Sequence, residues 1–159
     1  MEFYYPNWLN DFWRICGTVF YDDRDHFVIP NEKRFDIQSV KGFCAEKGIA
    51  LYDTATEVRR LKDNASDKFL EVVTPTDIAA LLAQIPECRA VVTTGQKATD
   101  VLVGAFGCDE PRVGGRTPVT IAARQYDFWR MPSTSRAYPL PLKQKAEAYK
   151  LLFTTTNLL

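Results

Sequence analysis

Two short segments combine hydroxyl, amide and cationic side chains in a way that suits the binding of a phosphate group. Ser133-Thr134-Ser135-Arg136 places three hydroxyls and a guanidinium on one turn, directly after an apolar run. Thr93-Thr94-Gly95-Gln96-Lys97 joins glycine, amide and ammonium groups after another apolar run. Turns of this kind hold phosphate oxygens with their N–H and hydroxyl groups. The same residue types also serve only to cap a helix or to turn a strand into one, so both interpretations stay open.

Aromatic residues gather near the N-terminus, where Tyr4, Tyr5 and Trp8 could stack on a nucleobase. A cluster of this kind at the start of a helix is also typical of core packing, and this alternative stays open too. The four cysteines stand singly and His26 is the only histidine, so no cluster has the spacing of metal ligands. We therefore expect reduced thiols, no metal and no cofactor.

The elements that must position these side chains follow from hydrophobic periodicity. Helical spacing predicts helices over residues 7–21, 37–47, 75–85, 96–105 and 142–153. In the third of these, Thr74 is the expected N-cap, Pro75 the first helical residue and Asp77 an acidic residue at the third position. Apolar runs predict strands over residues 89–94, 119–122 and 126–131, and a strand or extended loop over 49–53.

Length and composition fit one globular domain spanning residues 1–159. The chain has 46% hydrophobic and 25% charged residues, which argues against disorder. Twenty basic and twenty acidic residues cancel, but residues 111–150 hold eight cations against two acids, a local excess of +6. No apolar run approaches the roughly 18 residues that a membrane span needs, and no signal sequence is present, so we expect a cytoplasmic protein without a membrane partner.

Alternating helices and strands indicate an α/β fold, with ligands expected where loops leave the carboxyl ends of strands. In their order along the chain, four segments resemble the uracil-DNA glycosylase superfamily, most closely its mismatch-specific uracil/thymine branch. These segments are Tyr5-Pro6-Asn7-Trp8-Leu9-Asn10-Asp11-Phe12-Trp13-Arg14, Gly48-Ile49-Ala50-Leu51-Tyr52-Asp53, Thr94-Gly95-Gln96-Lys97-Ala98 and Phe128-Trp129-Arg130-Met131-Pro132-Ser133-Thr134-Ser135. The final helix is similar as well. The resemblance implies a three-layer α/β/α fold around a short, mainly parallel sheet, and DNA as the partner.

The same resemblance implies a role for each candidate residue in flipping a nucleotide out of the duplex. Tyr5, with Tyr4 as the nearest substitute, would stack on the flipped pyrimidine, and Asn10 would form the pocket wall. Ser133, Thr134 and Ser135 would hold the backbone, and Arg136 would enter the minor groove as a wedge. Further backbone contacts would come from the turn that holds Gly95, Gln96 and Lys97.

One part of the family pattern has no counterpart in the chain. The water-activating Asn or Asp of the superfamily stands on a Gly-x-x-Pro turn before the first of these segments, and the chain begins directly in front of that segment. The catalytic residue is therefore unknown, and we expect a chain truncated at its N-terminus, with a homodimer as one way to cover the sheet edge left open. Three functions stay open: hydrolysis of the N-glycosidic bond of uracil or mismatched thymine in DNA, non-catalytic binding of DNA or a nucleobase, and action on a small phosphorylated ligand.

Overall fold

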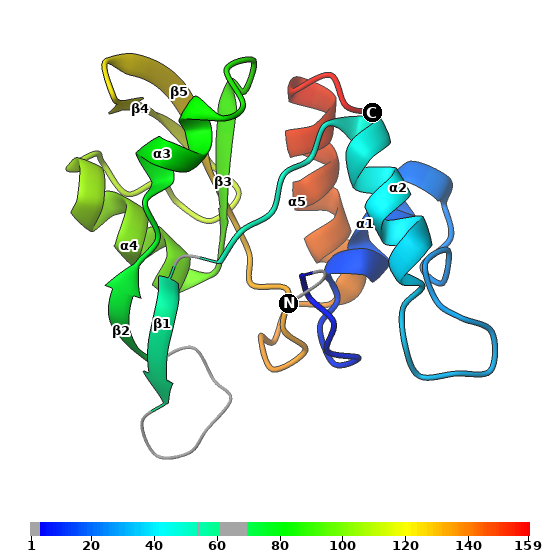
Figure 1. Cartoon of the computed structure of the whole chain (residues 1–159). Coiled ribbons are helices and arrows are strands. Elements are labelled where there is room, and N and C mark those ends of the chain that lie inside the picture. The colour runs from blue at the N-terminus through cyan, green and yellow to red at the C-terminus, as the bar shows by residue number, and fades with distance from the viewer. Residues whose placement is uncertain (1–3, 54, 61–69) are drawn as a thin grey trace. The chain divides into compact units, whose positions relative to one another are not determined.

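The computed structural model describes residues 4–53, 55–60 and 70–159. The chain divides into two compact units: unit 1 comprises Met1–Tyr52 and Pro132–Leu159, and unit 2 comprises Asp53–Met131. Unit 1 is helical, with α1 (Phe12–Tyr21), α2 (Ile37–Lys47) and α5 (Leu142–Thr155) (Figure 1). Unit 2 holds β1 (Ala55–Arg60), β2 (Leu70–Pro75), α3 (Ile78–Ala83), β3 (Ala90–Thr94), α4 (Gln96–Phe106), β4 (Arg116–Ile121) and β5 (Arg124–Met131).

Unit 2 contains a three-stranded sheet in the order β3-β5-β4. The central strand β5 pairs in parallel with β3 and antiparallel with β4. The sheet is therefore mixed, and only one of its two strand pairs meets the expectation of a mainly parallel sheet. β1 and β2 form a separate antiparallel pair. The α/β class is confirmed.

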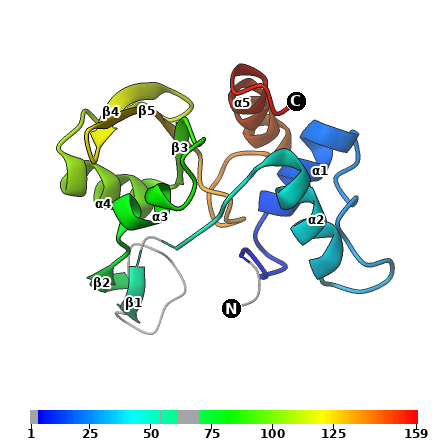
Figure 2. The ribbon, with the colours of Figure 1, turned by 45° about the horizontal axis from the view of Figure 1, so that its top comes forward.

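One face of the three-stranded sheet packs against α3 and α4 (Figure 2). The alternation of the strands supplies this core, because every second residue of β4 and β5 points to the same face. The buried residues are Leu82, Leu102, Val119, Ile121, Tyr126 and Phe128. These helices and strands together fix the strand-to-helix turn at Gly95.

Unit 1 is built around aromatic side chains of its helices and of the segment between α1 and α2. Trp13 contacts Phe27 edge to face at 6.0 Å, and Phe27 contacts Phe43 at 5.1 Å. Phe12 meets Tyr149 of α5 at 6.2 Å between ring centroids. Edge-to-face pairs at such separations add to the stability gained from burial. This core holds α1 and α5 side by side (Figure 1).

Helix α1 begins five residues later than predicted. Asn7 and Asn10 explain the difference, because each accepts a backbone N–H two residues on, from Leu9 at 2.8 Å and from Phe12 at 2.9 Å. Such local bonds compete with helical hydrogen bonding. Residues 7–11 therefore form turns that precede the helix, and Asn10 lies on a loop.

The start of α3 also corrects the sequence prediction. Thr74 and Pro75 are the last residues of β2, and the N-cap is Asp77, whose carboxylate accepts from Ala80 N at 3.0 Å. Aspartate caps a helix as well as threonine does, so the local sequence allowed both starts. Residues 49–53 form no strand, and β1 follows at Ala55.

Candidate functional site

Two segments that are far apart in the sequence are hydrogen-bonded to each other in unit 1. Asn10 and Ser135 form an antiparallel bridge. Asp11 N donates to Thr134 O at 2.7 Å, and Arg136 N donates to Leu9 O at 3.0 Å. The structure thus brings together Asn10 of the predicted base pocket and the predicted backbone-binding loop 133–136.

The loop 133–136 is held by its own hydroxyls. Ser133 Oγ accepts from Ser135 N at 3.3 Å, and Ser135 Oγ accepts from Ala137 N at 3.2 Å. Such bonds are typical of serine-rich turns. Thr134 is only 2% exposed, whereas Ser133 and Ser135 are half-buried and Arg136 is exposed. The loop therefore offers a ligand Ser133, Ser135 and Arg136, while the side chain of Thr134 points into the protein.

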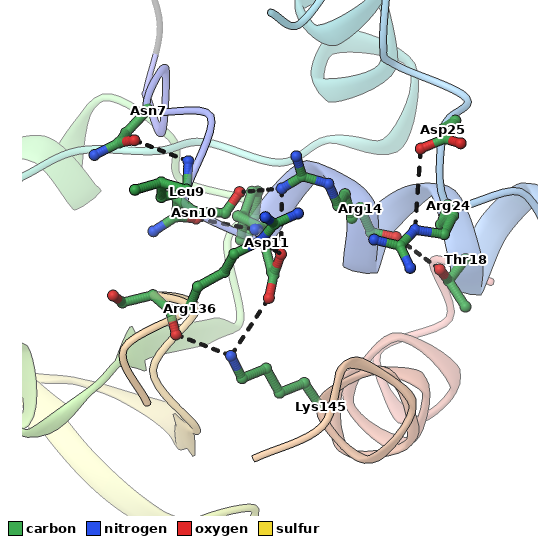
Figure 3. A network of polar contacts seen from close by, with 12 residues as sticks. Asn7, Leu9, Asn10, Asp11, Arg14, Thr18, Arg24, Asp25, Arg136 and Lys145 are labelled. Atoms are coloured by element: carbon green, nitrogen blue, oxygen red, sulfur yellow. Dashed lines mark hydrogen bonds and ion pairs between the residues drawn. The ribbon is translucent and has the colours of Figure 1, made fainter. Parts of the chain in front are cut away.

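Asp11 is the centre of an ionic cluster (Figure 3). Its Oδ1 lies 3.2 Å from Arg14 Nη1 and 3.3 Å from Arg136 Nε, and its Oδ2 lies 3.5 Å from Lys145 Nζ. Lys145 also donates to Ser135 O at 2.9 Å. The side chains of Arg14 and Lys145 are each 1% exposed, whereas that of Arg136 is 41% exposed. Two buried cations and one accessible cation thus share a single carboxylate.

Arg14 lies in an aromatic environment with incomplete hydrogen bonding. Its guanidinium carbon is 4.3 Å from the centroid of the Trp8 ring and 5.2 Å from that of Phe35. Nη1 donates to Asn10 O and to Asp11, but Nη2 is buried and has no hydrogen-bond partner among the residues that the structure describes. Burial and the nearby Arg136 lower the pKa of Arg14, and Asp11 opposes this shift.

The two tyrosines predicted to stack on a base are part of the aromatic packing of unit 1. The Tyr5 ring stacks on Phe12 with centroids 4.5 Å apart, and its backbone has a positive φ of 55°. Tyr4 O accepts from Trp13 Nε1 at 3.0 Å, and the Tyr4 ring lies 6.1 Å from that of Tyr52. Both side chains remain half-buried rather than fully enclosed.

The turn that holds Gly95, Gln96 and Lys97 belongs to unit 2. Gly95 N donates to Met131 O at 3.2 Å, and Gly95 O accepts from the Thr99 hydroxyl at 2.8 Å. The Gln96 amide donates to Asp100 at 2.7 Å and to Glu110 at 3.1 Å, and its oxygen accepts from Arg130 Nη2. Both the nitrogen and the oxygen of the Gln96 amide are thus hydrogen-bonded within the protein. Lys97 is half-buried.

No group of three His, Cys, Asp or Glu side chains suited to a metal ion occurs in the described part of the chain. In the same residues, no helix is long and apolar enough to span a bilayer. A hollow of about 430 Å³ lies beside α3 and α4 in unit 2, lined by residues such as Ile78, Val101 and Phe106. None of the candidate site residues lines it.

Comparisons with protein-family models, with curated proteins and with solved structures give no match for this chain. The site is therefore interpreted from its own residues. Sequence reasoning missed Asp11, Arg14 and Lys145 as members of it. Lys145 could have been found from the sequence, because it lies three residues after Leu142 and four before Tyr149, on the apolar stripe of its helix. A lysine on that stripe indicates a buried cation that needs a partner.

Proposed function

We propose that this chain is a DNA-binding protein of the uracil-DNA glycosylase type. Proteins of this type hydrolyse the N-glycosidic bond of uracil or mismatched thymine after flipping the nucleotide, and the water-activating residue of this chain is unknown. The proposal extends to a cytoplasmic protein with a three-layer α/β/α arrangement. No metal or cofactor is required by it. DNA is the partner, and a homodimer over a sheet edge remains part of the expectation.

A single observation carries the proposal: the segment around Asn10 and the loop around Ser135 are bridged to each other in unit 1. The family resemblance implies a base-pocket role for the first segment and a DNA-backbone role for the second. Base flipping requires both functions at one place, because the extruded base and its strained backbone are only one nucleotide apart. The exposed Arg136 at the end of the loop supplies the cation for such a contact.

In this proposal Tyr5, with Tyr4 as the nearest substitute, supplies an aromatic ring for the flipped pyrimidine, and Asn10 forms the pocket wall. Ser133, Ser135 and Arg136 grip the backbone from the paired loop. The proposal also keeps Thr134 as a part of this loop that acts through its backbone. Within unit 2, it keeps the turn of Gly95, Gln96 and Lys97 as a separate candidate contact with the DNA backbone.

A second candidate, a module that binds DNA or a nucleobase without catalysis, is favoured by the state of Asp11. It is the only carboxylate in the paired segments 4–11 and 133–136, and it is 6% exposed with three cations on its oxygens. A general base must be within hydrogen-bond reach of the water that it activates. Asp11 is occupied in holding the two segments together and does not fit that role.

The test is an assay of base release on defined duplexes. The protein is incubated with DNA carrying a single G·U or G·T pair and with single-stranded uracil DNA, and abasic sites are then cleaved with alkali. The glycosylase proposal expects strand scission at the modified position. Arg136→Gln should lower the yield, whereas Arg34→Gln should leave it unchanged, because Arg34 pairs with Glu32 on the surface outside the two paired segments.

A binding assay separates the two candidates. Fluorescence anisotropy with uracil-containing and undamaged duplexes should show tighter binding to the former if either candidate is right. Scission together with binding supports the enzyme, and binding without scission supports the non-catalytic module. Absence of both overturns the proposed function.

A further inference from the structure

The ionic cluster around Asp11 is not balanced in charge. Arg14, Arg136 and Lys145 each bring a positive charge, and Asp11 contributes the single negative charge, which leaves an excess of two positive charges. Charged groups removed from water are costly unless they are paired and hydrogen-bonded. Here Arg14 and Lys145 are fully buried. The cluster therefore has a physical reason to attract a further anion.

The hydrogen bonds of the cluster identify where that anion would be held. Arg14 Nη2 is buried and has no partner in the described residues, so this hydrogen-bond donor is unsatisfied. Arg136 uses Nε toward Asp11 and reaches solvent with much of its side chain. Guanidinium groups donate in a planar fork that suits the oxygens of phosphate. Two arginines and a lysine at one carboxylate are a donor set that suits a tetrahedral oxyanion.

The aromatic rings at Arg14 support the same conclusion. Trp8 and Phe35 lie over the guanidinium and keep it in place without supplying a hydrogen-bond acceptor. The ring faces stabilise its charge, but the N–H group at Nη2 still lacks an oxygen. Figure 3 shows that Arg14, Arg136 and Lys145 approach Asp11 from three different segments, namely α1, the loop 133–136 and α5.

We propose that the cluster of Arg14, Arg136 and Lys145 around Asp11 is a binding site for a phosphate-type oxyanion. Asp11 pairs with all three cations in the free protein. The oxyanion binds at the partly exposed Arg136, and the charges of the buried Arg14 and Lys145 behind it strengthen the binding. The anion is either a phosphodiester of a nucleic acid or a free phosphate. This inference involves Arg14 and Lys145, which the proposed function does not use, and it does not depend on any reaction.

The experiment is a titration of the whole chain with inorganic phosphate at constant ionic strength, followed by isothermal calorimetry and by ³¹P line broadening. Phosphate should bind with saturation, and chloride at the same ionic strength should not replace it. Arg136→Gln should weaken phosphate binding about tenfold, because a hydrogen bond to a charged group contributes about that factor or more. The control Lys143→Gln, at an exposed position of the same helix as Lys145, should change the affinity less than twofold.

Asp11→Asn gives a readout that a purely structural role would not produce. Without the competing carboxylate, phosphate should bind several-fold more tightly and should raise the melting temperature more than it does in the wild-type protein. Where Asp11→Asn does not fold, Arg136→Gln decides the question, since Arg136 is half-exposed. Equal phosphate binding by the wild-type protein and Arg136→Gln overturns the proposal, and so does the absence of saturable binding.

A competition arm identifies the source of the anion. A short duplex added to the phosphate-bound protein displaces phosphate if the site takes a nucleic-acid phosphodiester, and leaves it in place if the site takes a free phosphate. Both results support an oxyanion site. Absence of phosphate binding in a protein that still cleaves or binds DNA overturns this inference alone, whereas phosphate binding without any DNA interaction overturns only the proposed function.

Discussion

At the scale of single residues, burial sets the chemistry of several side chains more strongly than their type does. Asp11 and Lys145 are a charged pair enclosed by protein, with side chains 9% and 1% exposed. Lys145 is held by a carbonyl oxygen as well as a carboxylate, so its charge is stabilised within the fold. The ionic contacts therefore act as a tie between α1, the loop 133–136 and α5 rather than as a surface salt bridge.

The reactivity of Cys44 tests directly how burial changes the pKa of one side chain. The four cysteines are free thiols, and burial raises the pKa of Cys44 to about 11. Because the thiolate is the reactive form, a raised pKa makes Cys44 unreactive near neutral pH. Alkylation of Cys44 by iodoacetamide, followed by mass spectrometry of the native protein, should accelerate about tenfold for each pH unit from 7 to 10.

Free glutathione is the control for this measurement, since an unperturbed thiol levels off near its ordinary pKa of about 8.5. A rate for Cys44 that levels off below pH 10 would contradict the expected shift. Loss of the fold in this range is checked by circular dichroism of the same samples.

At the scale of elements, the turn between β3 and α4 depends on glycine. Gly95 has φ 91° and ψ 172°, a conformation that residues with a Cβ rarely adopt. Gly95→Ala should therefore lower the free energy of unfolding by about 1–3 kcal/mol, as measured by urea denaturation. It should also weaken any binding at this turn.

Gly104→Ala is the matched control within α4. Nothing lies within 4 Å of a Cβ built at Gly104, and the residue is inside the helix. Alanine in a helix is favoured over glycine by about 0.5–1 kcal/mol, so this variant should be more stable. An equal loss of stability in both variants would show that the strain at Gly95 is not the cause.

The hairpin between β4 and β5 turns through two alanines in the left-handed region. Ala122 and Ala123 have φ of 51° and 65°, where glycine or asparagine is preferred. Each alanine costs roughly 1 kcal/mol there, so the double change Ala122→Asn with Ala123→Gly should stabilise the protein by about 1–2 kcal/mol. The midpoint of urea unfolding should rise, and an unchanged or lower midpoint would contradict this account.

The same elements show how far the sequence predicts the fold. The helices α2, α4 and α5 and the strands β3 and β5 follow clear periodic patterns, and the structure has them near the expected residues. The turn at Ala122 and Ala123 has no residue that favours turns, and Ala55–Arg60 is too polar to be predicted as a strand. Neither element could therefore be predicted from the sequence. The predicted start of α1 was wrong because the side chains of Asn7 and Asn10 accept backbone N–H groups in place of helical hydrogen bonds.

For the candidate site, the family resemblance suggested Asn10 and the loop 133–136 as candidates, and the structure brings these two segments together. The contacts of Asp11 with Arg136 and Lys145 could not be predicted, because they join residues more than a hundred positions apart. Such pairing is decided by tertiary packing and leaves no local pattern. Only Lys145 on its apolar stripe indicated that a partner was needed.

At the scale of the whole molecule, the distribution of charge matters more than its sum. The chain is neutral, and the +6 segment of residues 111–150 crosses the boundary between the two units at Met131 and Pro132. Residues 132–150 hold four cations against one acid, a net charge of +3, in the unit that contains the loop 133–136. A neutral chain exerts little long-range attraction on DNA, so the proposed DNA binding should depend on a few local phosphate contacts.

If the chain binds DNA as proposed, the salt dependence of binding measures the number of phosphate contacts. The slope of log K against log salt is about −0.9 for each phosphate that a cation neutralises on duplex DNA. If Arg136 contacts one phosphate, Arg136→Gln should make the slope shallower by about 0.9, with a loss of affinity that is independent of the sequence bound. Arg34→Gln should leave the slope unchanged. Anisotropy titrations from 50 to 200 mM KCl give the slopes. Equal slopes for Arg136→Gln and the wild-type protein would exclude Arg136 from the phosphate contacts, because removing a bound cation must change the number of counterions released.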